Sequence, residues 1–548
     1  MSHWTDHLAI APVVLPLIAG ASMLLLDERR RSVKAAINIV STFTLLGVAI
    51  ALMAMADASG AGASSAPAVV YRLGDWPVPF SIVLVLDRLS ALMLVLTSIL
   101  ACASLIFSLA RWDRAGIYFH ALFQFLLMGL NGAFLTGDLF NLFVFFELLL
   151  AASYGLVLHG SGPRRVRAGL HYIAINLAAS MLFLVGVSLI YAVTGTLNMA
   201  DLVHRIAAVT PENQTLLEVG AAMLGIAFLV KAGMWPLCFW LPTTYAAASP
   251  PVAAIFAIMT KVGIYVLLRL SLLLSGHDSG ALAHFGGDWL LFGGMMTIVY
   301  GLIGALASQD TVRLAGFAVL VSSGTLLAVV GTGQAGITGG ALFYLVSSTL
   351  ALSAFFLLIE LVERGREAGA DMLAVTMEAF GEDEKDLEHE EEVGIATPAT
   401  LAILGLSFVG CTLLIAGMPP LSGFIAKFAL LTALLNPPDL ETGRAVPGTV
   451  WVLLALLVLS GLATLIAMMR AGIRTFWSSV ERAVPSVRLI EILPVGVLLF
   501  LCLALTVGAG PAMRYMQATA EALHAPQSHV EGILLPPVVL ESRKGGGA

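Results

Sequence analysis

Four ionisable side chains lie well inside apolar segments long enough to cross a lipid bilayer. A charge at the middle of a membrane costs several kcal/mol unless it is paired or hydrated. Each of the four therefore needs a structural or functional reason. They are Glu147 in segment 139–158, Lys231 in 218–236, Lys261 in 252–274, and Lys427 just after a proline-containing segment.

An amine and a carboxylate held together in an apolar environment can exchange protons. Burial lowers the pKa of a lysine, and a nearby carboxylate raises it again. We expect Glu147 and Lys231 to titrate as a coupled pair, and Lys261 and Lys427 to extend the relay through buried water. The structural alternative is a static ion pair that fixes helix packing. It would account for Glu147 and one lysine, but not for two further lysines without matching acids.

Other polar residues in the apolar segments have more ordinary explanations. Asp87 and Asp138 lie at the edges of predicted helices, where the helix dipole favours an acid near the N-terminus. The functional alternative is an accessory place in the proton relay, which we also consider for His171, Ser322, Ser347 and Ser348. Arg269 is close enough to the end of its segment to extend toward the membrane surface. The residues expected to hydrogen-bond between helices are His120, Gln124, Asn131, His171 and Asn176.

The sequence contains no phosphate-binding loop, metal-ligand cluster or nucleophile triad that rises above chance. We therefore predict neither a cofactor nor a catalytic metal, and we do not expect the chain to be an enzyme. The four cysteines, which occur singly in apolar stretches, are predicted to be packing residues. They are Cys102, Cys238, Cys411 and Cys502.

The elements that position these residues are predicted to be transmembrane helices. The chain is 59% hydrophobic and 11% charged, which a soluble protein of this length could not accommodate. Apolar runs of about twenty residues recur, long enough to cross a hydrocarbon core of about 30 Å, without the alternation of a β-barrel. We expect about fourteen helices in an all-α polytopic protein. The remaining runs include 8–26, 35–56, 84–109, 117–135, 168–192, 288–307, 339–360, 449–469 and 491–510.

Lysine and arginine are concentrated in every second predicted connection, as in Arg29 to Arg31 and Arg164 to Arg167. Because basic loops stay in the cytoplasm, both termini are predicted to lie on the periplasmic or outer side. The expected location is the inner (cell) membrane of a bacterium.

Two similar segments predict interrupted helices. One reads Gly233-Met-Trp-Pro-Leu237 and the other Gly417-Met-Pro-Pro-Leu421. Proline within a helix removes a backbone hydrogen bond and clashes with the preceding turn. Paired interruptions in two halves of a membrane protein indicate a transport site. The alternative is two ordinary proline kinks.

One segment differs sharply from the rest of the chain. Residues 363–392 contain twelve acidic and three basic side chains, whereas the whole chain has a net charge of −7. Such a run is typical of a solvated loop, and a cation-collecting or partner-docking arm is the functional alternative. The C-terminal tail is expected to be loosely held.

The segments that carry these residues resemble a known family. They are Thr136-Gly-Asp-Leu-Phe-Asn-Leu-Phe-Val-Phe-Phe-Glu147, Ala227-Phe-Leu-Val-Lys231, Phe239-Trp-Leu-Pro242, Thr260-Lys-Val-Gly-Ile-Tyr265 and Gly417-Met-Pro-Pro-Leu-Ser-Gly-Phe424. Nearly the whole chain resembles the antiporter-like subunits shared by respiratory complex I and the multisubunit Mrp/Pha cation–proton antiporters. Within that group it looks most like the D subunit of the antiporters.

The resemblance implies two inverted five-helix repeats, each with one broken helix. It also implies roles: Glu147 and Lys231 as the pair of the first half-channel, Lys261 as the bridging lysine, and Lys427 as the terminal proton-binding residue. Many members have titratable His and Lys residues in the central helices. The matching positions here are Ser322, Ser347, Ser348 and Leu352. Serine can hydrogen-bond to water but neither binds an additional proton nor ionises near pH 7. Water must therefore bridge Lys261 and Lys427.

On this basis the chain divides into seven parts. They are N-terminal helices (1–114), a first repeat forming the proton half-channel (115–274), the start of a second repeat (288–360), an acidic cytoplasmic loop (361–396), the end of the second repeat (397–470), the last helix with its approach (471–510) and the tail (511–548).

The resemblance implies a subunit of a secondary Na⁺(K⁺)/H⁺ antiporter, with the other Mrp/Pha subunits as partners and no nucleic acid. Two alternatives remain open: a proton-translocating subunit of a complex I-like or hydrogenase redox complex, and a structural scaffold whose charges serve assembly alone.

Overall fold

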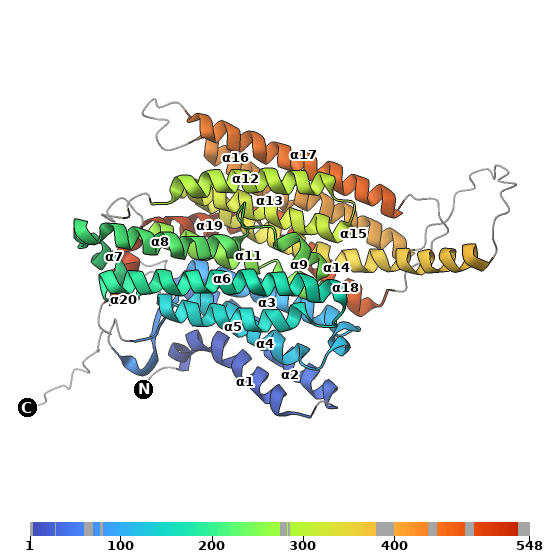
Figure 1. Cartoon of the computed structure of the whole chain (residues 1–548), viewed down its shortest axis with the longest axis horizontal. Helices are drawn as coiled ribbons and strands as arrows, with labels where there is room; N and C mark the ends of the chain where they lie inside the picture. The colour runs from blue at the N-terminus through green and yellow to red at the C-terminus, as the bar shows by residue number, and fades with distance from the viewer. Residues whose placement is uncertain are drawn as a thin grey trace, which may run out of the picture.

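The protein is a bundle of long helices that run side by side, shown in Figure 1 for a computed structural model. The structure describes residues 4–27, 29–59, 69–76, 81–274, 282, 285–379, 399–436, 446–476 and 487–534. Within this part, 13 helices are long and apolar enough to cross a membrane. The shorter apolar helix α4 (Phe119–Leu135) adds a further span, which agrees with the predicted number of about fourteen.

The first half of the chain contains α1 (Ala11–Leu25), α2 (Arg31–Ser59), α3 (Arg88–Ser108), α5 (Leu139–Val157), α6 (Pro163–Thr194), α7 (Met199–Ala207), α8 (Pro211–Ala232), α9 (Leu241–Ala247), α10 (Pro250–Phe256) and α11 (Met259–Leu274). The second half contains α12 (Gly287–Ala307), α13 (Thr311–Thr332), α14 (Ala335–Ala379), α15 (Ala399–Ala416), α16 (Ser422–Leu435), α17 (Gly448–Phe476), α18 (Leu489–Val507), α19 (Ala509–His524) and α20 (Pro526–Leu534). Short 3₁₀ helices are η1 (Trp4–Ile10), η2 (Leu73–Asp75) and η3 (Trp112–Ala115).

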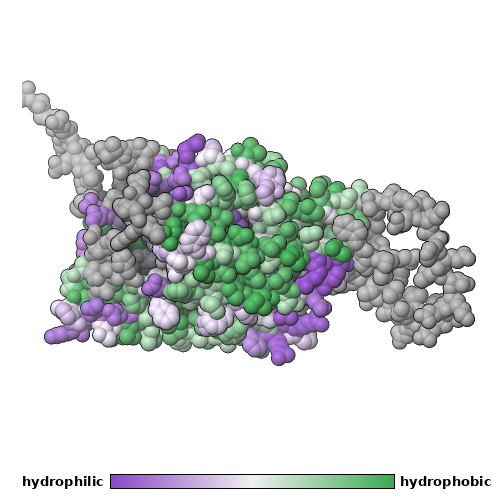
Figure 2. Space-filling view, turned by 90° about the horizontal axis from the view of Figure 1, so that it is seen from above, coloured by the Kyte–Doolittle hydropathy of each residue, from purple (hydrophilic) through white to green (hydrophobic). Residues whose placement is uncertain are grey.

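The outer surface carries the pattern of a membrane protein. In Figure 2, hydrophobic residues gather over the middle of the molecule and hydrophilic residues lie toward the ends of the helices. Exposed apolar side chains such as Leu177, Leu406 and Val458 project from α6, α15 and α17. Because lipid tails are the solvent at this depth, an apolar exterior is the stable arrangement.

Both predicted helix interruptions are present. Helix α8 ends at Ala232 and is followed by Gly233 with φ 73°. Helix α15 ends at Ala416, Gly417 has φ 75°, and α16 begins at Ser422. A left-handed conformation is readily adopted by glycine, and the prolines that follow cannot continue the helical bonding. These two breaks confirm the prediction from the paired sequence segments.

Helices α12 and α13 pack in direct backbone contact. A Cβ atom on Gly294 would lie 2.3 Å from the backbone nitrogen of Ala328, and one on Gly324 would lie 2.8 Å from the Gly294 carbonyl oxygen. Small residues of this kind allow transmembrane helices to approach closely. The contact holds α13, which carries Ser322, against the outer helix α12.

Three sequence predictions differ from the structure. Segment 84–109 begins as strand β2 (Val83–Leu86), which pairs antiparallel with β1 (Val69–Arg72), because a valine-rich run suits a strand. The predicted loop 361–396 is helical as far as Ala379, where Ala, Leu, Met and Glu favour helix; residues 380–398 lie outside the described part.

The predicted tail 511–548 is the third difference. Residues 509–534 form α19 and α20, and α19 buries Met516 and Ala520. The apolar side chains of this segment recur at helical spacing, so one face can pack on the bundle. The Tyr515 hydroxyl also donates to the Arg88 carbonyl oxygen at 3.0 Å. Residues 535–548 lie outside the described part.

The close contact between α12 and α13 predicts that adding one methyl group at the interface lowers the stability of the protein. Replacing Gly294 by Ala forces the two backbones apart and should lower the stability of the detergent-solubilised protein by about 1–3 kcal/mol. Gly225 of α8 has no atom within 4 Å of an added Cβ, so Gly225→Ala is the matched control. Thermal unfolding of the two variants measures the difference, and equal stability would contradict the close packing.

Candidate functional site

Lys231 is buried at the C-terminal end of α8, immediately before the first helix break. Its Nζ donates to Asn176 Oδ1 at 3.4 Å and lies 5.6 Å from the centroid of the Phe146 ring. The partial negative charge at a helix C-terminus favours a cation there. An amide oxygen, an aromatic face and a helix end therefore stabilise this ammonium group.

Glu147 follows Phe146 on α5 and lies within the range at which its charge acts on Lys231. Its Oε1 is buried and has no hydrogen-bond partner among the described residues. The two groups thus interact at a distance and do not form a direct ion pair. An unpaired carboxylate oxygen in a buried position is costly unless it gains a proton or a hydrogen bond.

Lys261 is fully buried on α11, between the two halves of the chain. Its Nζ donates to Ser322 Oγ on α13 at 2.8 Å, and Ser322 Oγ donates to Ser348 Oγ on α14 at 3.0 Å. The neighbouring Ser347 is hydrogen-bonded through Oγ to Ser422 Oγ, 2.8 Å away at the start of α16. One hydrogen-bonded group therefore joins Lys261 to α14, and a second joins α14 to the start of α16 at the second helix break.

Lys427 is buried on α16 and turns back toward that break. Its Nζ donates to the carbonyl oxygen of Ala416, the last residue of α15, at 2.9 Å. A Cβ atom on Gly461 of α17 would lie 3.1 Å from the same Nζ. Lys427 thus satisfies a carbonyl that the interruption leaves without a helical partner, so this amine, like that of Lys231, lies at the C-terminal end of a helix.

A small cavity lies along the line of serines. The space available to the centre of a water-sized sphere is about 10 Å³, close to the minimum for one water molecule. Its lining includes Ser322, Tyr344, Ser347, Ser348, Leu352 and Thr464. The hydroxyl groups here can form hydrogen bonds with such a water molecule. None of the serines can bind an additional proton at neutral pH.

Asp87 and Asp138 are both N-terminal caps of helices. The Asp87 carboxylate accepts from the Ser90 backbone N–H at 2.8 Å, and Asp138 accepts from Phe140 and Asn141 at 2.8 and 2.9 Å. Burial raises the pKa of the Asp138 carboxyl above its ordinary value, while the two N–H donors act in the opposite direction. Both carboxylates therefore cap the helices that follow them.

Arg269, expected to extend toward the membrane surface, has an ionic partner within the protein. It is buried and forms an ion pair with Asp87 at 2.8 Å, with its guanidinium 5.1 Å from the Tyr265 ring centroid. A charged partner from another helix stabilises the guanidinium in place of water. The residues are 182 positions apart, so no local pattern reveals the pair.

His171 does not join the line of buried lysines. It is exposed on α6, and its Nδ1 lies 2.8 Å from the Arg167 carbonyl oxygen. The other polar residues do hydrogen-bond within the bundle: His120 and Gln124 to Asn38, Asn131 to Pro12, and Asn176 to Lys231. The four cysteines are free and buried, in agreement with a packing role.

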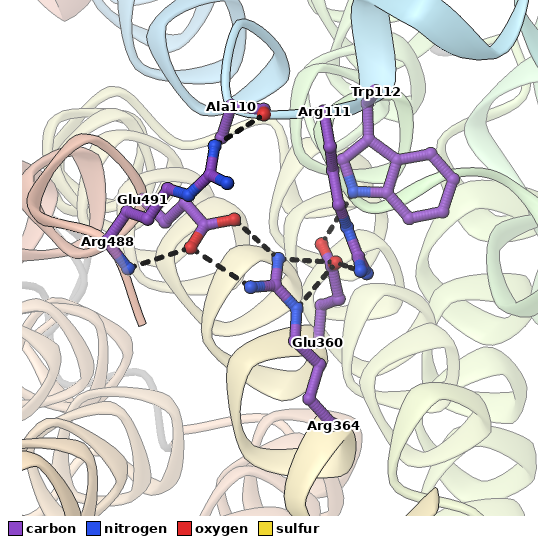
Figure 3. A network of polar contacts seen from close by, with 7 residues as sticks. All are labelled: Ala110, Arg111, Trp112, Glu360, Arg364, Arg488 and Glu491. Atoms are coloured by element: carbon purple, nitrogen blue, oxygen red, sulfur yellow. Dashed lines mark hydrogen bonds and ion pairs between the residues drawn. The ribbon is translucent and has the colours of Figure 1, made fainter. Parts of the chain in front are cut away.

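Sequence reasoning missed a network at one end of the bundle (Figure 3). Glu360 of α14 pairs with Arg111 and Arg364 and accepts from Trp112 Nε1 at 2.8 Å. Arg364 also pairs with Glu491 of α18 at 2.7 Å. The available signal was the spacing of Glu360 and Arg364, four residues apart on one helix. The network joins the corner after α3 to the middle of α14 and the first turn of α18.

The described residues hold no group of three or more His, Cys, Asp or Glu side chains that could bind a metal ion. The side chains at the site are instead suited to binding and passing protons. The lysines can gain and lose protons, and the serines and the cavity can link them by hydrogen bonds.

The chain is similar to known membrane proteins over almost its whole length. Residues 136–438 match the family described as "NADH:quinone oxidoreductase/Mrp antiporter, TM". The chain is 62% identical to the D subunit of a probable K⁺/H⁺ antiporter of Rhizobium meliloti, covering 98% of this chain and 99% of the relative. It is 34% identical to the D subunit of a Na⁺/H⁺ antiporter of Alkalihalophilus pseudofirmus, covering 96% and 99%.

The fold also matches a chain in the structure of the Mrp complex from Dietzia sp., with a TM-score of 0.79, 24% identity and coverage of 98% of this chain and 100% of that chain. A chain of respiratory complex I from Thermus thermophilus matches with a TM-score of 0.72 and 22% identity, covering 96% and 100%. At these identities the likeness shows the fold alone.

Breaking the Asp87–Arg269 ion pair should lower the stability of the protein. Asp87→Asn leaves the Arg269 charge buried without its anion and should cost about 3–5 kcal/mol, seen as a lower unfolding temperature of the solubilised protein. Replacing both residues by apolar ones, Asp87→Leu with Arg269→Met, should recover a substantial part. A single variant as stable as the unmodified protein would show that the pair contributes nothing.

Proposed function

The chain belongs to the family of transmembrane subunits shared by NADH:quinone oxidoreductase and Mrp antiporters, and from this we propose that it is the D subunit of a secondary antiporter exchanging K⁺ or Na⁺ for protons. Its relatives at 62% and 34% identity, matched over nearly their whole length, are named as D subunits of K⁺/H⁺ and Na⁺/H⁺ antiporters. Those names favour antiport over the redox-complex alternative.

In this proposal the proton path runs along the buried lysines. Glu147 and Lys231 form the first station, because the Glu147 carboxylate acts on the Lys231 amine without a direct ion pair. Lys261 lies in the middle, and Lys427 is the last station. A proton released by one lysine would pass through hydroxyl groups and water to the next.

The observation that carries the proposal is the hydrogen-bonded line from Lys261 through Ser322 to Ser348. A separate hydrogen bond joins the neighbouring residue, Ser347, to Ser422 at the start of the helix that holds Lys427, and a water in the shared cavity would have to bridge the two pairs. A scaffold would need charges only where helices are joined, whereas this line connects a buried amine to a water-sized cavity. Serines therefore provide the connection for which other members use titratable groups.

The helix breaks supply a second part of the mechanism. Lys231 lies in the last turn of α8, and Lys427 binds the last carbonyl of α15. A cation at either place is stabilised by the negative end of the helix dipole. A small change at a break would alter this stabilisation and so change the affinity of the lysine for its proton.

The proposed setting is a hetero-oligomeric complex in the bacterial cell membrane. The partners are the other subunits of the Mrp/Pha antiporter, with H⁺ and K⁺ or Na⁺ as the transported ions. The positive-inside distribution of Lys and Arg supports termini on the outer side of the membrane.

Replacing Glu147 by Gln tests the first station of the path. The variant keeps the size of the side chain but cannot carry the charge that acts on Lys231, so exchange driven by a pH gradient should fall at least about tenfold, equivalent to about 1.4 kcal/mol. Exchange is measured in everted vesicles containing the whole complex. Glu212→Gln, at an exposed position in the first turn of α8, is the control. Normal exchange with normal assembly would refute a role for Glu147.

A pair of neighbouring serines tests the line between the lysines. Ser322→Ala removes the acceptor of Lys261 and should slow exchange about tenfold or more. Ser323→Ala removes an equally buried hydroxyl that has no hydrogen-bond partner in the described part of the chain, and should leave the rate unchanged. Equal rates in the two variants would place the proton path elsewhere.

A further inference from the structure

A second buried polar cluster lies away from the lysines, between helices α2 and α4. Asn38, Ser41 and Thr42 come from α2, and His120 and Gln124 from α4. All five side chains are buried, with His120 4% exposed and Asn38 fully buried. Hydrogen bonds of this kind can simply hold two membrane helices together, but one member of this cluster is titratable.

The hydrogen bonds in the cluster all point in one direction. Ser41 Oγ donates to Gln124 Oε1 at 3.0 Å, and Gln124 Nε2 donates to Asn38 Oδ1 at 2.6 Å. Because Asn38 Oδ1 is already an acceptor, the amide nitrogen is the atom that faces His120 Nδ1, 2.9 Å away. Nδ1 therefore accepts, and the proton of the neutral imidazole is on Nε2.

The other side of the imidazole faces a carboxylate. His120 Nε2 lies 3.8 Å from Asp113 Oδ2 in η3. Neither Nε2 nor Asp113 Oδ1 has a hydrogen-bond partner among the described residues, although both atoms are buried. The distance is too long for a hydrogen bond and short enough for a carboxylate to stabilise an imidazolium ion. The two unsatisfied atoms point to a group that changes its charge.

We propose that His120 is a second proton-binding site of this subunit, separate from the line of lysines, and that proton uptake there reverses the hydrogen-bond chain between α4 and α2. With a proton on Nδ1 the imidazolium must donate to Asn38. The amides of Asn38 and Gln124 then turn over, and Gln124 donates to Ser41, whose hydroxyl can accept as well as donate. One proton is gained, and no bond between heavy atoms forms or breaks.

Other charged and titratable groups surround the site. His159 interacts electrostatically with both Asp113 and His120, and its Nε2 lies 2.7 Å from the Trp112 carbonyl oxygen. Burial lowers the pKa of His159, whereas its bond to Trp112 acts against that change, so this ring tends to stay neutral. Arg165 binds the His159 carbonyl oxygen at 2.7 Å.

Lys34 is buried one helical turn before Asn38 on α2. It and Arg165 are cations that oppose a proton on His120, and Asp113 is the anion that favours one.

The test is the deuterium exchange of the imidazole C2–H, whose rate depends on the protonation of that ring and is measured for single histidines by mass spectrometry. The whole antiporter complex is incubated in D₂O buffers from pH 5 to 9. For His120 we expect a sigmoidal profile of rate against pH. Asp113→Asn should move its midpoint down by about one unit or more, and Asn38→Asp, which places an anion at Nδ1, should move it up. The exposed His171 is the internal control and should not move.

A His120 profile without a transition, or one that neither substitution moves, would overturn the proposal. So would shifts of the same size at His171. Because exchange at C2 is measured without transport, the result does not depend on the path from Glu147 to Lys427: a failure there leaves this site intact, and the reverse also holds.

Discussion

The structure depends on how each charge inside the membrane is stabilised. Arg269 has a direct carboxylate partner, Asp87. Lys231 and Lys427 are held at the ends of interrupted helices, and Lys261 has a serine hydroxyl. These stabilising interactions differ in strength. A direct ion pair fixes its charges, whereas an amide, a carbonyl or a hydroxyl leaves an amine able to lose its proton when its surroundings change. The chain thus contains one buried cation with a direct carboxylate partner and three buried amines held by neutral groups.

The two interruptions explain why the bundle can hold these amines at mid-membrane depth. Carbonyl groups inside a continuous helix already accept a backbone N–H, whereas the last carbonyls of a helix have no such partner and are better placed to accept from a buried ammonium. By ending at Ala416, α15 leaves a carbonyl for Lys427, and the glycine that follows allows the chain to turn without strain. Close packing against Gly417 and Gly461 then leaves little room for lipid or bulk water around the amine. The same segment therefore binds the charge and isolates it.

Much of this could be predicted from the sequence, for a physical reason. Apolar runs, prolines after glycines and isolated charges are local signals, and they indicated the helices, both breaks and the four buried ionisable residues. Other contacts join segments that are far apart in the sequence. They are Asp87 with Arg269, Arg364 with Glu491, and Asn38 with His120. No local pattern encodes such partners. The helical extension of α14 and helices α19 and α20 were missed because charged and polar composition suggested loops.

The central claim is that amines without a direct ion pair pass protons through hydroxyl groups and water. It is tested most directly at Lys261, the lysine that donates to the line of serines. The whole complex carrying Lys261→Gln is reconstituted into liposomes, and the internal pH is followed after a K⁺ or Na⁺ gradient is imposed. We expect an assembled complex in which the cation gradient no longer moves protons. Proton movement at the rate of the unmodified complex would contradict the claim.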